Sequence, residues 1–187
     1  MKNLKIKKTN LPINSILTNS GIKYHYVDSY IGQIDDERNE ISSTDLGKAF
    51  FSSGPKWTGH LFTLRNKIVV LFGLKTNGKV NDRQQQLADF KCVKGEELGL
   101  FKVYHKSENE VVLGQDDKHL NFRVSLFVRT SEDSNKQKEI IITTTVVFNN
   151  WFGRLYFLPV KPFHSIIVPV MLKGIIKSLI ARILRSV

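Results

Sequence analysis

Three residues that could bind a metal or transfer protons stand close together in the middle of the sequence. They are Asp116, Asp117 and His119, and Glu110 precedes them. Carboxylate and imidazole groups at this density could form a metal site or an acid–base pair. However, an Asp-Asp-Lys run directly before an expected strand is also typical of a turn. We favour the turn, because the sequence identifies no further ligands for a metal.

Two arginines could serve these acids or an external anion. Arg123 and Arg154 could anchor an anionic ligand, or they could form ion pairs with the acids. In its expected strand, Arg123 has the parity that points away from the apolar side chains. We therefore favour a structural ion pair on the outer sheet face, with Asp117 or Glu110 as the partner. The predicted structural polar cluster is Glu110, Asp117, His119, Arg123 and Arg154.

The most unusual stretch is Asn149–Phe157, where two side-chain amides are followed by four aromatic residues. Trp151 and Tyr156 would suit the half-wet mouth of an apolar pocket. The same stretch could instead pack a corner between the last strand and the last helix. The residues alone favour neither interpretation.

Two further side chains could face a ligand. His164 lies in the first turn of the expected final helix, where it could hydrogen-bond a ligand, although a capping or surface role is more common. Trp57 belongs to the apolar stripe of an expected helix, and a residue of such a stripe can also line a cavity.

Nucleophile and cofactor motifs are missing from the sequence. It contains no GxSxG nucleophile elbow, no P-loop and no GxGxxG between a strand and a helix. The single cysteine, Cys92, excludes an internal disulfide framework and a zinc site built from several cysteines. We expect Cys92 to be a buried strand or loop residue, and we predict no catalytic residue, no metal and no cofactor.

The elements that must position these residues follow the order of an α+β domain. An aromatic and β-branched strand is expected over 24–31, followed by a helix from Ser42 or Ser43 to Phe51, with Asp45 well placed for the helix dipole. A second helix is expected over 57–72, and strands joined by short polar turns then form an antiparallel meander. The strands are expected over 98–105, 110–113, 120–128 and 139–148, and the stripe of the second helix is Trp57, Leu61, Leu64, Ile68 and Leu71.

A long amphipathic helix is expected at the end, over 160–186. Val168 and Leu172 fall within its apolar arc, and lysines and arginines occupy the other arc. Pro169 should kink or break this helix. Because residues 120–128 alternate between apolar and polar, one sheet face must be covered, and the helix can cover it. A sheet that curls around the helix would enclose an apolar cavity.

The charge of the chain is concentrated at its ends. The 187 residues include 28 Lys and Arg against 17 Asp and Glu, a net charge of +11. The first 27 residues contain five lysines, the last 37 contain six Lys or Arg, and neither stretch contains an acid. The neutral middle has no basic stripe, which argues against nucleic acid as a partner. The basic ends suit an anionic membrane surface if both lie on one face.

Length and hydropathy predict one domain over 1–187, with a basic N-terminal arm over 1–22 and the C-terminal amphipathic helix over 160–186. No apolar segment of a secretory signal follows the basic residues Met1–Lys8, and no stretch reaches the roughly 18 apolar residues of a spanning helix. We expect a cytoplasmic protein with a reduced thiol, and peripheral membrane association is the alternative.

Six stretches of the sequence carry a resemblance: Tyr26–Tyr30, Phe50–Trp57, Leu64–Lys67, Leu113–Arg123, Asn149–Phe157 and Pro159–His164. They resemble a bacterial family, the domain-of-unknown-function 2867 family, from about residue 11 to residue 184. The order of the elements resembles the helix-grip fold of the START and Bet v-like superfamily (SRPBCC proteins).

The resemblance implies a curved antiparallel sheet wrapped on the long C-terminal helix, with two short helices after the first strand. It implies no particular activity, but the superfamily is similar in holding lipids and other apolar small molecules. We therefore predict a module that binds an apolar small molecule or lipid between sheet and helix, without catalysis. The alternatives are a peripheral membrane protein that uses the basic ends, and an accessory domain to a short-chain-dehydrogenase-like reductase. The expected cavity residues are Trp57, Leu61, Phe122, Val124, Trp151, Tyr156, His164 and Leu172.

Overall fold

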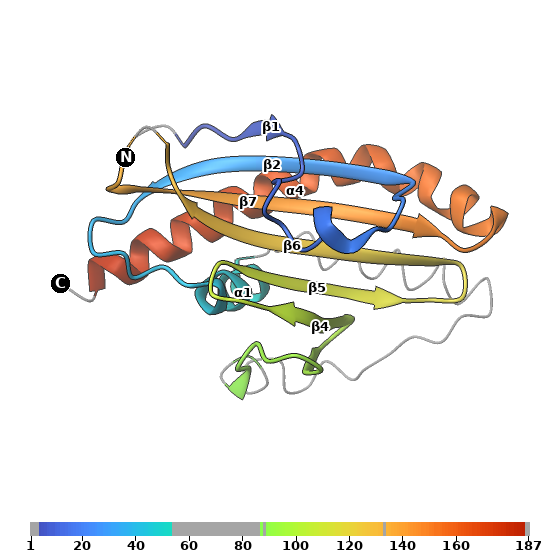
Figure 1. Ribbon diagram of the computed structural model, residues 1–187, viewed down its shortest axis with the longest axis horizontal. Coiled ribbons are helices and arrows are strands. Elements are labelled where there is room, and N and C mark those ends of the chain that lie inside the picture. The colour runs from blue at the N-terminus through green and yellow to red at the C-terminus, as the bar shows by residue number, and fades with distance from the viewer. Residues whose placement is uncertain (1–3, 54–86, 88, 133, 186–187) are drawn as a thin grey trace.

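The computed structural model describes residues 4–53, 87, 89–132 and 134–185 (Figure 1). Within these residues the architecture is α+β, with a seven-stranded antiparallel sheet in the order β1-β2-β7-β6-β5-β4-β3 and a long C-terminal helix. The helix predicted over 57–72 lies outside the described residues. The elements are β1 (Lys7–Thr9), the 3₁₀ turn η1 (Thr18–Ser20), β2 (Tyr26–Asp35), α1 (Ser43–Ser52), β3 (Glu97–Leu98), β4 (Phe101–Lys106), β5 (Glu110–Asp116), β6 (Leu120–Thr130), β7 (Gln137–Phe148) and α4 (Trp151–Arg185).

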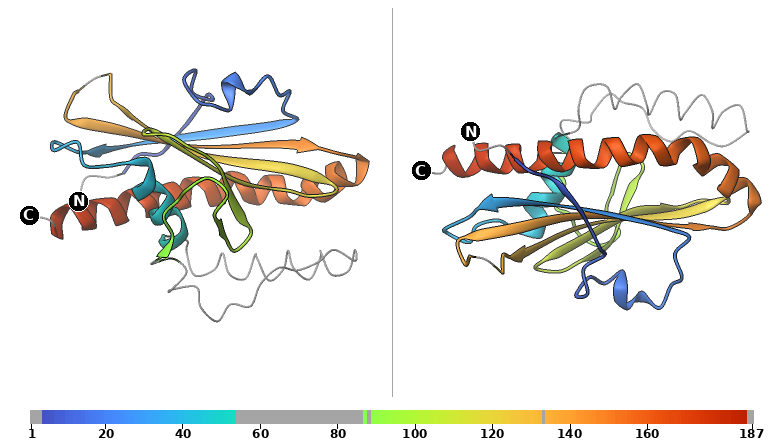
Figure 2. Two further views of the ribbon diagram at one scale, coloured as in Figure 1. Left: turned by 60° about the horizontal axis from the view of Figure 1, so that its bottom comes forward. Right: turned by 90° about the horizontal axis from the view of Figure 1, so that it is seen from above.

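The described elements form three layers. Helices α1 and α4 lie on one face of the sheet, which we call the inner face, and the chain between β1 and β2 crosses the opposite, outer face (Figure 2). The prediction that the C-terminal helix covers one face of an antiparallel sheet is confirmed. The short strand β1 is a correction to the sequence analysis, which expected only a basic arm over these residues.

The core between the sheet and α4 follows from alternation along the strands. Val124 and Leu126 of β6 are buried toward the inner face, and Leu126 stands opposite Ile142 of β7. Each such aliphatic side chain contributes roughly 1.5–3 kcal/mol when it leaves water. The facing stripe of α4 is made of Val168, Leu172, Ile175, Ile176 and Leu179, all buried.

Helix α1 begins where the sequence predicted it. The side chain of Ser42 accepts a hydrogen bond from the backbone of Asp45, and the carboxylate of Asp45 accepts one from the backbone of Ser42. This reciprocal pair satisfies two amides that a helix start leaves without partners. Arg182 of α4 also donates to Asp45, so the start of α1 is tied directly to the last turns of the long helix.

Helix α4 differs from its prediction at its start and at its prolines. It begins at Trp151 rather than near residue 160, because the side-chain oxygen of Asn150 accepts from the backbone of Gly153 and caps the first turn. Pro159, Pro162 and Pro169 lie inside one continuous helix, so Pro169 does not end it. Packing of the apolar stripe on the sheet outweighs the hydrogen bonds that the prolines remove.

A buried glutamate holds the N-terminal segment on the outer face. Glu110 accepts hydrogen bonds from the hydroxyl of Ser15 at 2.6 Å and from the backbone of Ile16 at 2.8 Å, and the hydroxyl of Ser125 donates to it as well. Leu17, which follows, is only 5% exposed. The single carboxylate therefore joins the segment between β1 and β2 to strands β5 and β6.

Replacing this carboxylate should destabilise the fold. In Glu110→Ala, three donors lose their acceptor in a buried place, and we expect the free energy of unfolding to fall by about 3 kcal/mol. Glu108→Ala, at an exposed glutamate on the preceding turn, should change it by less than about 0.5 kcal/mol. Urea denaturation of both variants measures the difference. Equal stabilities would show that Glu110 does not hold the segment.

Candidate functional site

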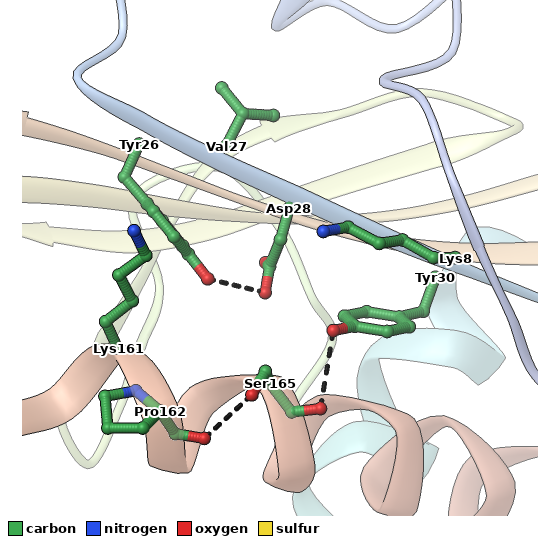
Figure 3. Close-up of a pocket in the computed structure, with 8 residues that line it drawn as sticks. All are labelled: Lys8, Tyr26, Val27, Asp28, Tyr30, Lys161, Pro162 and Ser165. Atoms are coloured by element: carbon green, nitrogen blue, oxygen red, sulfur yellow. Dashed lines mark hydrogen bonds between the residues drawn. The ribbon is translucent and has the colours of Figure 1, made fainter.

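A hollow opens at the edge of the sheet where β1 ends. Strand β1 pairs with β2 only from Lys7↔Ile31 to Thr9↔Ser29, so the start of β2 has no described strand on that side. Helix α4 passes along this open edge. The space between them, which we call the β2–α4 hollow, has a volume of about 280 Å³ (Figure 3). It is lined by Lys8, Tyr26, Val27, Asp28, Tyr30, Lys161, Pro162 and Ser165.

Asp28 is the buried carboxylate of the hollow, with a side chain only 3% exposed. Its Oδ2 accepts a hydrogen bond from the hydroxyl of Tyr26 at 2.8 Å, and Nδ1 of His164 lies 3.2 Å from the same oxygen. Its Oδ1 is buried and has no hydrogen-bond partner among the described residues. Since a buried polar atom without a partner costs free energy, one side of this carboxylate can still accept a donor.

A second unsatisfied polar atom lies beside Asp28. Thr144 of β7 stands directly opposite Asp28 in the β2–β7 ladder, so both side chains project from the same face of the sheet. The hydroxyl oxygen of Thr144 is buried, and within the described chain it too has no partner. Two neighbouring strands therefore present an acceptor and a hydroxyl at one place under α4.

Burial and Asp28 together raise the pKa of Tyr26. Burial has the largest effect, and the hydrogen bond to Asp28 and its negative charge act in the same direction. The pKa of Tyr30 is raised by burial and then by Asp28, and the hydroxyl of Tyr30 donates to the carbonyl of Ser165 at 3.3 Å. Both phenols are therefore neutral hydrogen-bond donors at physiological pH.

Lys8 and Lys161 bring positive charge to the mouth of the hollow. Both are exposed, and in the described part of the chain neither has a carboxylate within ion-pair distance. The ammonium of Lys161 lies 5.9 Å from the centre of the Tyr26 ring, a cation–π distance. Figure 3 shows the ammonium of Lys8 pointing toward Asp28. The hollow thus combines a cationic mouth, two phenols and one buried carboxylate.

The predicted polar cluster is divided between separate places. Arg123 lies on the outer face and pairs with Asp116 at 2.8 Å, rather than with Asp117 or Glu110. The register explains the choice of partner, because it sets Arg123 opposite Gly114, and Asp116 is the next residue of β5 on that face. The guanidinium also lies 3.5 Å from the centre of the Tyr104 ring. Glu110 holds the N-terminal segment instead, and Arg154 is exposed on α4.

Asp117 and His119 form the β5–β6 turn. The carboxylate of Asp117 accepts from the backbone of His119 at 3.1 Å, which is turn geometry. The ring of His119 contacts the amide of Asn150, so the turn is joined to the cap of α4. No group of three His, Cys, Asp or Glu side chains within the described ranges is arranged to hold a metal ion.

The predicted cavity residues that the structure describes lie at several places, and none of them lines the β2–α4 hollow. Val124 and Leu172 are buried in the core, and Phe122 packs against that core. Trp151 is 73% exposed at the start of α4, and Tyr156 is half-buried one turn later. His164 contacts a residue that lines the hollow, Asp28, through Nδ1. Trp57 and Leu61 lie outside the described residues.

None of the eight residues that line the hollow was identified as a site residue from the sequence, and the missed residues include its charged groups, Lys8, Asp28 and Lys161. One signal was present. Asp28 is the only acid within an otherwise uncharged aromatic and β-branched run, Tyr24–Ile31, and an acid inside a strand that must bury one face is uncommon. Nothing in the sequence indicated that Lys8 and Lys161 line the same hollow, because their proximity depends on where β1 ends.

Cys92 is a poor nucleophile in this structure. It is fully buried, and burial raises the pKa of its thiol to about 11. Since the thiolate is the reactive form, this cysteine is inert at neutral pH. The expectation of a buried strand or loop residue is confirmed, and Cys92 lies in a loop.

One comparison with known proteins finds a match. A family model described as "Protein of unknown function (DUF2867)" matches residues 22–171. No curated protein and no solved structure matches the chain.

The Tyr26–Asp28 contact gives a prediction about pH. The unfolded chain ionises its tyrosines near pH 10, whereas folded Tyr26 keeps its proton longer. The free energy of unfolding should therefore fall as the pH rises above about 10. Asp28→Asn removes the negative charge, so the pKa of Tyr26 should move back toward the ordinary value while burial still raises it. Carbon NMR of labelled tyrosine, assigned with Tyr26→Phe, follows the titration. An unchanged Tyr26 titration in Asp28→Asn would contradict the contact.

Proposed function

The chain belongs to the DUF2867 family, and we propose that it is a helix-grip domain that binds an apolar small molecule or lipid between the sheet and α4, without catalysis. The family description states no activity, so the proposal depends on the chain's own architecture. An antiparallel sheet that packs one face on a long C-terminal helix supports the helix-grip assignment within the START and Bet v-like superfamily. We further propose that residues 1–187 form a single domain.

The observation that carries this proposal is the β2–α4 hollow. It lies between the sheet edge and the helix, and it is lined by Tyr26, Val27, Tyr30 and Pro162 in addition to its polar groups. Ligand sites are typically concave, apolar in large part, and equipped with a few polar groups that fix orientation. The hollow combines these features within the described residues.

The hollow is a better place for the ligand than the interior beneath α4. Leu172, Ile175 and Ile176 are fully buried against the inner face of the sheet, so this part of the interior is filled by side chains. Near the hollow, Phe163 and Ile166 of α4 are 52% and 61% exposed. They extend the apolar surface along the helix, where the tail of a lipid can lie.

Blocking the hollow tests the proposal. Ser165 lines the hollow, and Ser178 is an exposed serine further along the same helix. We expect Ser165→Trp to weaken binding of a fluorescent fatty alcohol by at least about tenfold, because the indole would fill the site, whereas Ser178→Trp should bind as the unmodified protein does. Fluorescence anisotropy measures both.

Two further measurements complete this test. Native mass spectrometry of protein purified from its own host should show a bound apolar molecule, and that molecule should be recovered chemically unchanged. Absence of binding by the unmodified protein to any lipid or aromatic probe, or equal binding by the two tryptophan variants, would refute the proposal.

A second candidate function is association with an anionic membrane surface. The termini lie at the same end of the molecule (Figures 1 and 2). A side chain added at Gly32 would meet both Ile6 of the N-terminal arm and Ile176 of α4, so arm and helix run next to each other. The part of the arm around Ile6 therefore lies beside α4, whereas Lys23 belongs to the segment that crosses the outer face. Among the described residues, no helix is both long and apolar enough to cross a bilayer.

Charge reversal tests this second function. Lys173 and Lys177 are exposed on α4, and lysines near anionic lipid contribute about 1 kcal/mol each. The double variant Lys173→Glu, Lys177→Glu should lose most of its co-sedimentation with vesicles of phosphatidylcholine and phosphatidylglycerol in equal parts. The matched control reverses Lys94 and Lys118, which are exposed in loops, and should retain it. Equal binding to pure phosphatidylcholine vesicles would contradict this function.

A further inference from the structure

We propose that the ligand of the β2–α4 hollow is an amphipathic oxyanion: a carboxylate or phosphate held by Lys8 and Lys161, with a neighbouring hydroxyl that donates to Asp28. This inference rests on the proposed function of the hollow as a ligand site and adds the chemistry of the group that enters it.

The two lysines define where the negative group binds. They come from opposite ends of the chain, one from β1 and one from α4, and both line the hollow. In the described chain neither ammonium is neutralised by a carboxylate within ion-pair distance. An oxyanion between them gains attraction from both charges without displacing an existing ion pair.

Asp28 defines where the hydrogen-bond donor binds. Its Oδ2 is occupied by Tyr26 and His164, whereas its buried Oδ1 has no partner among the described residues. Thr144, which stands opposite Asp28 on β7, carries a buried hydroxyl that likewise has no partner among the described residues. A ligand hydroxyl in the hollow donates to Asp28, which lines it, and so supplies the donor that Oδ1 lacks.

The order of these groups orients the ligand. A second negative charge beside Asp28 would be repelled, so the hydroxyl faces Asp28 and the oxyanion lies toward the ammonium groups at the mouth. The remainder of the ligand then lies against the Tyr26 ring, Val27 and Pro162, which are mainly apolar. A hydroxyl close to the oxyanion and an apolar chain beyond it match this arrangement.

Ammonium groups do not distinguish a carboxylate from a phosphate. Both lysines are point charges, and the hollow has no guanidinium whose planar fork would select one geometry. The oxyanion could therefore belong to a fatty-acid-like molecule, to a lipid phosphate or to free phosphate. The probes must separate these sources.

Isothermal titration calorimetry with five probes tests the inference, with the charged amphiphiles kept below their micelle concentrations. The probes are dodecanol, dodecanoate, β-hydroxydodecanoate, dodecyl phosphate and inorganic phosphate. We expect the two simple anionic amphiphiles to bind about tenfold more tightly than dodecanol, and the hydroxylated acid to bind about tenfold more tightly than dodecanoate. Inorganic phosphate should bind weakest, because it has no apolar part.

Variants assign the two contacts. Lys8→Met and Lys161→Met should each weaken the binding of the anionic amphiphiles about fivefold and leave the binding of dodecanol unchanged. Lys177→Met, which is on α4 but outside the hollow, should change neither affinity. Asp28→Asn should abolish the preference for the hydroxylated acid. Thr144→Val, at a residue that does not line the hollow, leaves the carboxylate in place and should retain the preference.

The outcomes separate this inference from the function on which it rests. If dodecanol binds as tightly as the anions, the hollow is a site for apolar molecules, and the proposal that the ligand carries an oxyanion is refuted. If no probe binds, the proposed function fails as well. If the anions bind tightly but the hydroxyl adds nothing, the role of Asp28 is refuted.

Discussion

The burial of the α4 stripe against the sheet is the interaction on which the other features depend. Leu172, Ile175 and Ile176 are fully buried, and they hold a helix of 35 residues in place despite its prolines. With α4 fixed, Arg182 can reach the cap of α1. Gly174 lets the two helices approach, because a side chain there would meet the carbonyl of Ser53 at 2.7 Å. The hollow follows from the same placement, since α4 passes the edge that β1 leaves uncovered.

The buried Asp28 has a cost that the fold compensates only in part. A carboxylate taken out of water requires hydrogen-bond donors or a counter-charge. Tyr26 supplies a donor and His164 a second polar contact, both to one oxygen, and the other oxygen is left without a partner in the described chain. A leucine at this position would pack under α4 without that cost. A half-satisfied acid at the edge of a hollow therefore supports the proposed ligand site and costs the fold stability.

Local patterns in the sequence predicted most of the longer elements, but they missed β1, merged β3 and β4 into one strand, and did not predict how the elements meet. The cap at Ser42, the alternation of β6 and the apolar arc around Leu172 are local or periodic signals, and the structure confirms them. The predicted start of α4 was wrong. Prolines disfavour a helix locally, but in the structure the Asn150 cap and the packing on the sheet outweigh this effect. The hollow depends on the residue at which β1 ends, and no spacing in the sequence encodes that end. The helix predicted over 57–72 lies outside the described residues.

The uneven distribution of charge acquires a physical meaning in this fold. The two acid-free ends are far apart in the sequence, but the arm runs next to α4, and each end contributes one lysine to the hollow. Two acids of the middle form contacts away from the hollow, Asp116 with Arg123 and Glu110 with Ser15, whereas Asp45 pairs with Arg182 of the basic helix itself. Lys8 and Lys161 have no carboxylate within ion-pair distance among the described residues, and such charges attract anions over about a Debye length, roughly 8–10 Å at physiological salt. With the proposed membrane association, a lipid would reach the hollow directly from the bilayer surface, because Lys8 and Lys161 stand at the mouth of the hollow.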